Sequence, residues 1–311
     1  MQLSLFDLHC DTAYRMLNEH QPLSDNFFCV SLKEARNFDR YYQVMALWTD
    51  QRLEDEQGWH VALQMLSNLK NDPMIKAGQA QLCVSCPSTK EAKAPVLMLS
   101  LEDARILNGN LDRVDELYRL GVRIFTPLWR GSSCIGGAHD TDHGLTEFGK
   151  AALCRALSRG MIPDISHASC PAAEEILTLA ETYGVPVIAS HSNAFGVCPV
   201  SRNLSDDKIG KIVKSGGVIG LNLHRYFLRA DGNATLDDIL LHIDYFLDRG
   251  AENALCLGAD MDGGEMPKEI PSLSYLPLLA EELQKRNFKD ELIHSIFFEN
   301  AYRFARRYIK L

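Results

Sequence analysis

Six residues that can bind a metal ion or transfer a proton each stand at, or just after, the end of an apolar, strand-like run. The runs are LSLFDL, PVLMLSLE, GMIPDISH, PVIASH and ALCLGAD. If these runs are parallel strands, their carboxyl ends meet at one edge of a sheet, which is how a metal-centred active site is assembled from distant segments. The six residues are His9, Asp11, Glu102, His167, His191 and Asp260.

The residue types indicate which ion they bind and which reaction follows. His9 and Asp11 form an H-x-D pair, and residues i and i+2 of an extended chain point the same way, so both can bind one ion. Glu102 has two carboxylate oxygens and can bridge two cations, which a neutral imidazole cannot do. Three nitrogen and two carboxylate ligands suit two borderline divalent ions, with zinc the first choice. Such ions activate a water for hydrolysis, and Asp260 is expected to take its proton.

The roles predicted for the two later histidines and for Asp260 each have an alternative interpretation. His167 and His191 both end strand-like runs, both follow a serine, and a helix fits between them, which indicates adjacent parallel strands. A single histidine of this kind is more often structural than a ligand, but two equivalent ones beside Glu102 favour a metal site. Asp262 could replace Asp260 as the acid–base group, and we prefer Asp260 because Asp262 already begins the following loop.

The segments that must position these residues alternate between apolar, β-rich runs and amphipathic helical patterns. Eight strands with intervening helices predict an α/β fold, a TIM-type (β/α)8 barrel, in one domain over residues 1–311. A doubly wound open sheet is the alternative, but it would not gather ligands from strands one, three, five, six and eight. The stretch 80–85 is expected to be an extra hairpin strand outside the barrel. The eight predicted strands are 3–8, 43–49, 96–102, 122–128, 161–166, 186–190, 217–223 and 254–259.

Additional C-terminal helices are predicted over 277–286 and 289–309, either outside the barrel or over its base. The aromatic stripe within the second helix is interpreted as helix packing rather than as a ligand site. Helical segments 112–121, 146–160, 171–184 and 235–250 each end at a glycine, which is typical of a helix C-terminus.

Composition narrows the classes of partner. The net charge of −9 over 311 residues disfavours a nucleic-acid partner, and no apolar run is long enough to span a bilayer. No secretory signal is visible at the N-terminus. Nine cysteines, an odd number without framework spacing, favour reduced thiols and a cytoplasmic location.

Five stretches together resemble the membrane (renal-type) dipeptidase family, peptidase family M19 of the metal-dependent amidohydrolase superfamily. They are FDLHCDT, LSLEDA, GLTEFGKAALCRALSRGMIPDISHAS, PVIASHSNAFGVCPVSRNLSDD and LGADMDG, in the order of that family. The resemblance implies that His9 and Asp11 bind one zinc ion, that His167 and His191 bind the other, and that Glu102 bridges both. It also implies that Arg202 holds the C-terminal carboxylate of a dipeptide. Asp260 would contact the bridging water and the free amino group of the substrate.

The chain departs from the family pattern at two places. Better-known members have a histidine that helps to polarise the scissile carbonyl, and this chain has Trp129 at that position, as some short bacterial members do. The indole N–H of Trp129 could still contact that carbonyl, but it cannot supply a charged donor. His139 or His143 on the following loop could supply that group, although both are expected to be exposed loop residues. His224 and Arg225 replace an aromatic and a small polar residue where a substrate side chain is expected. We therefore include Trp129 and His224 among the predicted substrate-binding residues.

The leading hypothesis is a zinc-dependent dipeptidase that hydrolyses L–L and L–D dipeptides through a metal-bridging hydroxide. The partner is then a small peptide, with no nucleic acid and no membrane, and the resemblance suggests a homodimer. The alternative enzyme is a related amidohydrolase acting on N-acyl amino acids or lactams, which needs Arg202 but no free amine. A binding module built on a metal-stabilised barrel draws support only from the two departures, and a purely structural zinc prefers a closed tetrahedral shell with thiolates.

Overall fold

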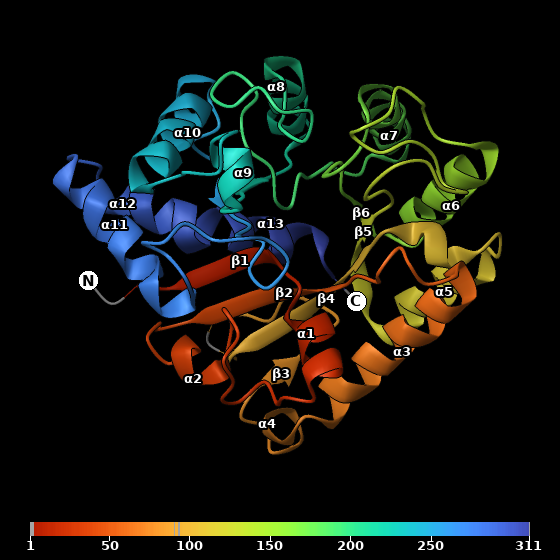
Figure 1. Ribbon diagram of the computed structural model, residues 1–311, viewed down its shortest axis with the longest axis horizontal. Coiled ribbons are helices and arrows are strands. Elements are labelled where there is room, and N and C mark those ends of the chain that lie inside the picture. Colours follow the sequence, from red (N-terminus) through yellow and green to blue (C-terminus); the bar gives the residue numbers. More distant parts are fainter. Residues whose placement is uncertain (1–2, 90, 93, 311) are drawn as a thin grey trace.

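A curled sheet of parallel strands forms the interior of the protein, and helices lie around it (Figure 1). The computed structural model describes residues 3–89, 91–92 and 94–310. The strands follow the order β6-β5-β4-β2-β1-β8-β7, and the short β3 (Gln81–Leu82) pairs with β4 beside this path. The bounds of the seven are β1 Leu5–Cys10, β2 Tyr41–Leu47, β4 Val96–Glu102, β5 Val122–Thr126, β6 Ile162–Pro163, β7 Ile219–Leu221 and β8 Leu255–Leu257.

The architecture is an α/β fold consistent with a TIM-like barrel, and it differs from the predicted strands at two segments. The predicted sixth strand, 186–190, forms no ladder of its own. Instead, Ile188 pairs with Asp164 and Ala189 pairs with Ile219 through single parallel bridges, so the continuous ladder is interrupted between β6 and β7. Stretch 80–85 was predicted as a hairpin strand, and this was wrong, because β3 pairs in parallel with β4.

The six predicted helical segments are helical in the structure, whereas α1, α3 and α8 were not predicted. Local chemistry explains the ends of several helices. The side chains of Thr146, Ser169 and Ser205 accept hydrogen bonds from the first turns of α6, α7 and α8, and Gly121 and Gly184 end α5 and α7 with left-handed backbone. None of the helices within the described ranges has the length and apolar character needed to cross a membrane. The α-helices are α1 Thr12–Glu19, α2 Leu32–Ala35, α3 Asp55–Asn71, α4 Pro73–Lys76, α5 Asp112–Leu120, α6 Glu147–Ser158, α7 Cys170–Tyr183, α8 Asp206–Ser215, α9 Arg225–Leu228, α10 Leu236–Asp248, α11 Leu276–Lys285, α12 Asp290–His294 and α13 Asn300–Tyr308.

The C-terminal helices close the base of the sheet. A π-helical turn, η3 (Ser295–Glu299), joins α12 to α13 in one continuous helical run. Phe298 and Phe304 from this run pack into the same buried cluster as Phe6 and Tyr42, which lie at the start of β1 and β2. The prediction of extra helices over the base is confirmed, and so is the interpretation of their aromatic residues as packing groups. The opposite, carboxyl-terminal edge of the sheet stays free for chemistry.

An irregularity in β1 determines where His9 points. Along β1, Phe6 and Leu8 belong to the cluster inside the sheet, whereas Cys10 belongs to the cluster outside it. The pairing register with β2 shifts between Asp7 and Cys10, so three steps of β1 are matched by two steps of β2. A bulge of this kind reverses the alternation of side chains, and it places His9 at the carboxyl edge of the interior.

Candidate metal centre

Five donor side chains from four separate segments of the chain form one buried cluster at the carboxyl edge of the sheet. Nε2 of His9 lies 3.3 Å from Oδ2 of Asp11 and 3.3 Å from Oε2 of Glu102. The Nε2 atoms of His167 and His191 lie 2.9 Å and 3.4 Å from Oε1 of Glu102. The structure therefore brings together the five residues that the sequence analysis selected as ligands, from positions 9 to 191 of the chain.

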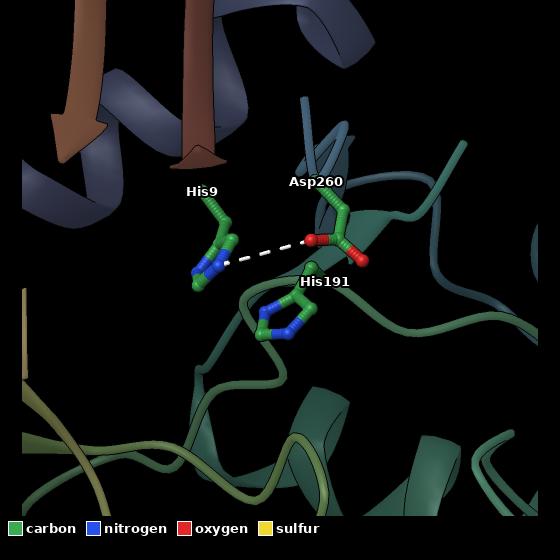
Figure 2. A group of neighbouring side chains, drawn as sticks. All are labelled: His9, His191 and Asp260. Carbon is green, nitrogen blue, oxygen red and sulfur yellow. Dashed lines mark ion pairs between the residues drawn. The ribbon is translucent and has the colours of Figure 1, made fainter. Parts of the chain in front are cut away.

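The two carboxylate oxygens of Glu102 face different donors. Oε2 is near His9 and Asp11, whereas Oε1 is near His167 and His191, and in each set the ligand atoms lie within 4.8 Å of one another. A third set joins His9 and His191 to Asp260. Figure 2 shows these last three side chains pointing toward one another, with the 4.0 Å ion pair between His9 and Asp260 dashed. The cluster thus offers adjacent sets of ligand atoms that share one carboxylate.

Hydrogen bonds on the far side of two imidazoles leave their inner nitrogens without protons. Nδ1 of His167 lies 3.0 Å from the carbonyl oxygen of Trp129, which only accepts, so we assign the proton to Nδ1. The Ser190 hydroxyl donates to Asp164 and accepts from Nδ1 of His191 at 2.7 Å. The two Nε2 lone pairs then face each other at 2.9 Å beside a carboxylate oxygen. Such a set of lone pairs without a shared proton fits a bound cation.

Burial sets the protonation of these groups. Loss of water contact lowers the pKa of His167 and of His191 well below 6.5, which keeps both imidazoles neutral and able to bind a metal. Burial also raises the pKa of Glu102 to about 7 and raises the pKa of Asp260. Ionised carboxylates are costly in such a place, and a divalent cation would compensate their charge. The electrostatics of the cluster therefore fit a metal centre.

Two buried polar residues that the sequence analysis did not single out hold the ligands in place. One oxygen of Asp164 accepts the backbone N–H groups of Ser166 and Ser190, and the other accepts the hydroxyls of Thr126 and Ser190. Asn222 donates to Oδ2 of Asp260 at 2.9 Å. An acidic residue inside the apolar run GMIPDISH was the signal that could have identified Asp164, because a buried charge needs hydrogen-bonding partners.

Strained backbone conformations concentrate at the same edge of the sheet. Asp103, His167, Asp260 and Asp262 have φ angles of 66°, 69°, 62° and 69°, in the left-handed region that side-chain-bearing residues rarely adopt. Each such residue costs on the order of 1–3 kcal/mol and persists only where its surroundings over-determine it. Here the left-handed residues let the chain turn sharply just past the strands, so that the ligands stay at the sheet edge.

The geometry distinguishes the two aspartates of the run GADMDG. Asp260 lines the cavity, with one oxygen held by Asn222 and the other 4.0 Å from Nε2 of His9. Asp262 also lines the cavity, but both of its oxygens are engaged, because it accepts the hydroxyl of Thr12 at 2.6 Å and the backbone N–H of Cys29 at 2.7 Å. Asp262 therefore ties two N-terminal segments to the site, and Asp260 is the one with an oxygen available for proton transfer.

A cavity of about 500 Å³ opens over the centre, and Glu102, His167 and Asp260 are part of its lining. One stretch of the lining is aromatic, since the rings of Tyr14 and Trp48 lie 4.8 Å apart and those of Trp48 and Trp129 lie 5.0 Å apart, both edge to face. The structure places both Trp129 and His224 in this lining. Trp129, His224 and Asp260 thus share one cavity with the metal-binding cluster, whereas Arg202 is not among the residues that line it.

The two histidines of the loop after β5 differ in their surroundings. His143 is exposed, as predicted, and its Nδ1 lies 3.2 Å from the hydroxyl of Ser132. His139 is half-buried and lines the cavity, with its ring centre 6.0 Å from that of His167. The expectation of an exposed His139 was wrong, because the loop folds back and the His139 N–H donates to the carbonyl of His167 at 2.7 Å.

Arg202 lies behind His191 in the loop that follows it. Its guanidinium donates to the hydroxyl of Ser192 at 2.8 Å and to the carbonyl oxygen of His191 at 2.9 Å. The side chain is buried, and burial lowers the pKa of Arg202 to about 10. Its Nε–H has no hydrogen-bond partner among the described residues. A buried guanidinium with a spare donor is well suited to bind a carboxylate.

The curled parallel sheet and the His/Asp/Glu cluster at its carboxyl edge define a metal-dependent hydrolase with a TIM-like fold. The family model for membrane dipeptidase, peptidase family M19, matches residues 1–309. The chain therefore belongs to this family, and the predictions of a metallopeptidase and of an enzyme that hydrolyses dipeptides are confirmed.

Similar proteins cover most of the chain. An uncharacterized protein from the pqqA 5′ region of Klebsiella pneumoniae is 32% identical over 252 residues, which are 76% of this chain and 92% of that protein. The crystal structure of dipeptidase AC, a metallo peptidase of family M19, has 25% identity and a TM-score of 0.91 over 99% of both chains. A metallo peptidase from Rhodobacter sphaeroides, liganded with a phosphinate mimic of L-Ala-D-Ala, has 24% identity and a TM-score of 0.90 over 99% of this chain and 100% of that one.

Proposed function

We propose that this dipeptidase holds two divalent ions, with zinc as the first choice and Glu102 as the shared ligand. The observation that supports this is the orientation of the two Glu102 oxygens toward separate donor pairs, His9 with Asp11 and His167 with His191. Imidazole and carboxylate groups are ligands that zinc and related borderline ions accept. When bound, such ions supply Lewis acidity and lower the pKa of a water.

We assign proton transfer, and contact with the amino group of the substrate, to Asp260. Asn222 holds Oδ2 of Asp260, which leaves Oδ1 free to accept a proton. Burial raises the pKa of this carboxyl, which brings it closer to the range where one group can both take and return a proton. The proton then passes to the amine that leaves when the peptide bond is cleaved.

We assign recognition of the C-terminal carboxylate to Arg202, and contact with the substrate side chains to Trp129 and His224. Arg202 supplies a buried positive charge with an unused N–H, whereas Asp260 supplies a negative charge in the cavity. Binding both charged ends selects a dipeptide over a longer peptide, because an end charge left unpaired in a closed site is costly. Tolerance of a C-terminal D-residue is supported by the Rhodobacter sphaeroides structure with its L-Ala-D-Ala mimic.

The test compares three compounds on one protein sample whose metal content is measured. We expect hydrolysis of L-Ala-L-Ala and L-Ala-D-Ala, no hydrolysis of N-acetyl-L-Ala-L-Ala, and two zinc ions per chain. The variant Asp260→Asn should keep its metal and lose about 10²–10⁴-fold in kcat, as expected for loss of a general base. Asp244→Asn, on the exposed face of α10, is the matched control and should behave as the wild type.

Hydrolysis of the N-acetyl compound would instead favour an amidohydrolase that acts on N-acyl amino acids or lactams. Full turnover by Asp260→Asn would remove Asp260 from the mechanism. One bound ion per chain, with full activity, would contradict the two-ion centre.

Three further proposals concern the closure of the barrel, the cellular location of the enzyme and its oligomeric state. We infer that 186–190 serves as the missing strand of a closed (β/α)8 barrel, which the bridges of Ile188 and Ala189 support. A cytoplasmic location is supported by the nine cysteines, all of which are free thiols. A homodimer is proposed on the family resemblance, and light scattering on the purified protein would test it.

A further inference from the structure

The loop between β5 and α6 holds His139 in a fixed position beside the metal-binding cluster. The backbone N–H of His139 donates to the carbonyl of His167 at 2.7 Å, and the neighbouring Ala138 forms an antiparallel bridge with Ala168. Gly137 is packed so closely against Thr141 that any larger side chain would displace the loop. A position that is fixed before substrate arrives suits a group that must act in the transition state.

The His139 ring has one nitrogen engaged and one available. Its Nδ1 lies 3.0 Å from the hydroxyl of Ser201, and no other partner of that hydroxyl occurs among the described residues. We assign the Ser201 hydroxyl as the donor, which leaves the ring proton on Nε2. His139 is therefore an N–H donor in the lining of the cavity.

Other polar side chains of the lining are less suited to this task. Arg15 is engaged by Glu19, with 2.5 Å between Nε and Oε1, and the side chain of Arg130 is 70% exposed beside Asp140. His224 receives the backbone N–H of Glu265 on Nδ1, but it lies after β7, and its ring packs against Phe227 rather than against a metal-binding residue. Among these four side chains, His139 is the one whose ring lies beside that of His167, with 6.0 Å between the ring centres.

Trp129 follows β5 and lines the cavity at the place where an N–H donor is expected. Its carbonyl oxygen is engaged by Nδ1 of His167, and its ring packs edge to face on Trp48, so it contributes aromatic surface to the cavity. When a nucleophile adds to the scissile carbonyl, negative charge develops on the carbonyl oxygen, and a preorganised N–H stabilises that charge more than it stabilises the ground state. The indole N–H of Trp129, whose ring centre lies 6.3 Å from that of His167, is one candidate for this donor, and His139 on the following loop is the other.

We propose that His139 is a catalytic residue whose Nε2–H donates a hydrogen bond to the carbonyl oxygen of the scissile peptide as it becomes an oxyanion. The proposal rests on the proposed dipeptidase function and adds a residue to it. A donor that acts on the transition state lowers the barrier while leaving substrate affinity nearly unchanged, which separates this role from simple substrate binding.

The experiment uses zinc-reconstituted full-length protein and the variants His139→Ala, His139→Gln and His143→Ala. Each is assayed for kcat and KM on L-Ala-D-Ala, for zinc content, for thermal midpoint, and for binding of a phosphinate mimic of L-Ala-D-Ala by calorimetry. The phosphinate has the tetrahedral shape and charge of the oxyanion, so its affinity reports the interaction without turnover. His143 lies on the same loop but is exposed, which makes it the matched control.

We expect His139→Ala to lose about 10²–10³-fold in kcat, the usual cost of one oxyanion donor, with KM and zinc content unchanged. The affinity of His139→Ala for the phosphinate should fall together with its kcat. His139→Gln should recover part of the kcat and part of the phosphinate affinity, because its amide still donates. His143→Ala should match the wild type. A threefold or smaller loss of kcat in His139→Ala would overturn the proposal. A raised KM with unchanged kcat would overturn it too and would assign His139 to carboxylate binding.

A failure of the proposed function can be told apart from a failure of this inference. If the wild type hydrolyses no dipeptide but binds the phosphinate, the dipeptidase assignment fails while the His139 donor is still judged by the loss of phosphinate affinity in His139→Ala. If the zinc-loaded wild type does not bind the phosphinate, both are overturned.

Discussion

Replacing Asp164 by asparagine should reverse the protonation of a metal ligand that Asp164 does not touch. In the wild type, Oδ2 of Asp164 accepts the Ser190 hydroxyl, so Oγ of Ser190 accepts the Nδ1 proton of His191. In Asp164→Asn, the amide oxygen keeps the backbone N–H groups, and the amide nitrogen faces the two hydroxyls. The Ser190 hydroxyl must then accept from the amide and donate to Nδ1 of His191. The histidine proton moves to Nε2, the atom that faces His167 and Glu102.

The size of the effect follows from these contacts. A metal ligand whose outer hydrogen bond is disrupted typically loses about 10–100-fold in metal affinity. For the metal-free protein, four hydrogen bonds to a charged group become bonds to a neutral one. Since the former contribute about 1.5–3 kcal/mol and the latter about 1 kcal/mol each, the free energy of unfolding should fall by at least about 2 kcal/mol.

Zinc affinity is measured by competition with a chromophoric chelator, and stability by urea unfolding of the metal-free protein. Thr126→Val is the matched control, because it removes one hydroxyl donor to Oδ2 of Asp164 at 2.7 Å and leaves the Ser190–His191 contact intact. This control should lose stability but not zinc affinity. Wild-type zinc affinity in Asp164→Asn would refute the tautomer argument, whatever its effect on stability.

Two further predictions concern residues around the centre. Burial raises the pKa of Asp7 from 3.8 to about 6, so the folded state binds this proton more tightly than the unfolded state, and the stability present below pH 4 is lost as the pH rises through 6. At 1.36 kcal/mol per pKa unit, the metal-free wild type should lose about 2 kcal/mol more free energy of unfolding between pH 4 and pH 7 than Asp7→Asn does, measured by urea unfolding. Equal losses in the two proteins would contradict this. A Cβ at Gly263 would overlap Oδ2 of Asp11, so Gly263→Ala should lower bound zinc, measured by elemental analysis. Gly210→Ala in α8, where a Cβ meets nothing within 4 Å, should retain full zinc, and equal zinc in both variants would refute the steric argument.

The strand periodicity and the positions of the strand ends were readable from the sequence, because these features depend on local composition. Apolar runs buried on both faces are recognisable as parallel strands, and acidic or histidine residues at their ends stand out against that background. This was sufficient to select Glu102, His167 and His191 as ligands and to predict the order of the main helices. The same local pattern predicted a regular strand over 186–190, and this prediction failed, because single bridges on each side replace a ladder there. Strand pairing depends on the two distant neighbours of a segment rather than on the segment itself.

Only the tertiary structure decided how the selected residues are oriented and which others join them. The bulge in β1 turns His9 inward against the normal alternation of a strand, and the left-handed backbone of His167 and Asp260 depends on contacts from other segments. His139 joined the cavity because its loop bonds to the carbonyl of His167. Composition and periodicity along the chain therefore determined the donor types and the sheet edge on which they stand. Tautomer, side-chain direction and burial were decided by hydrogen bonds between residues far apart in sequence, and such bonds leave no periodic trace in the chain.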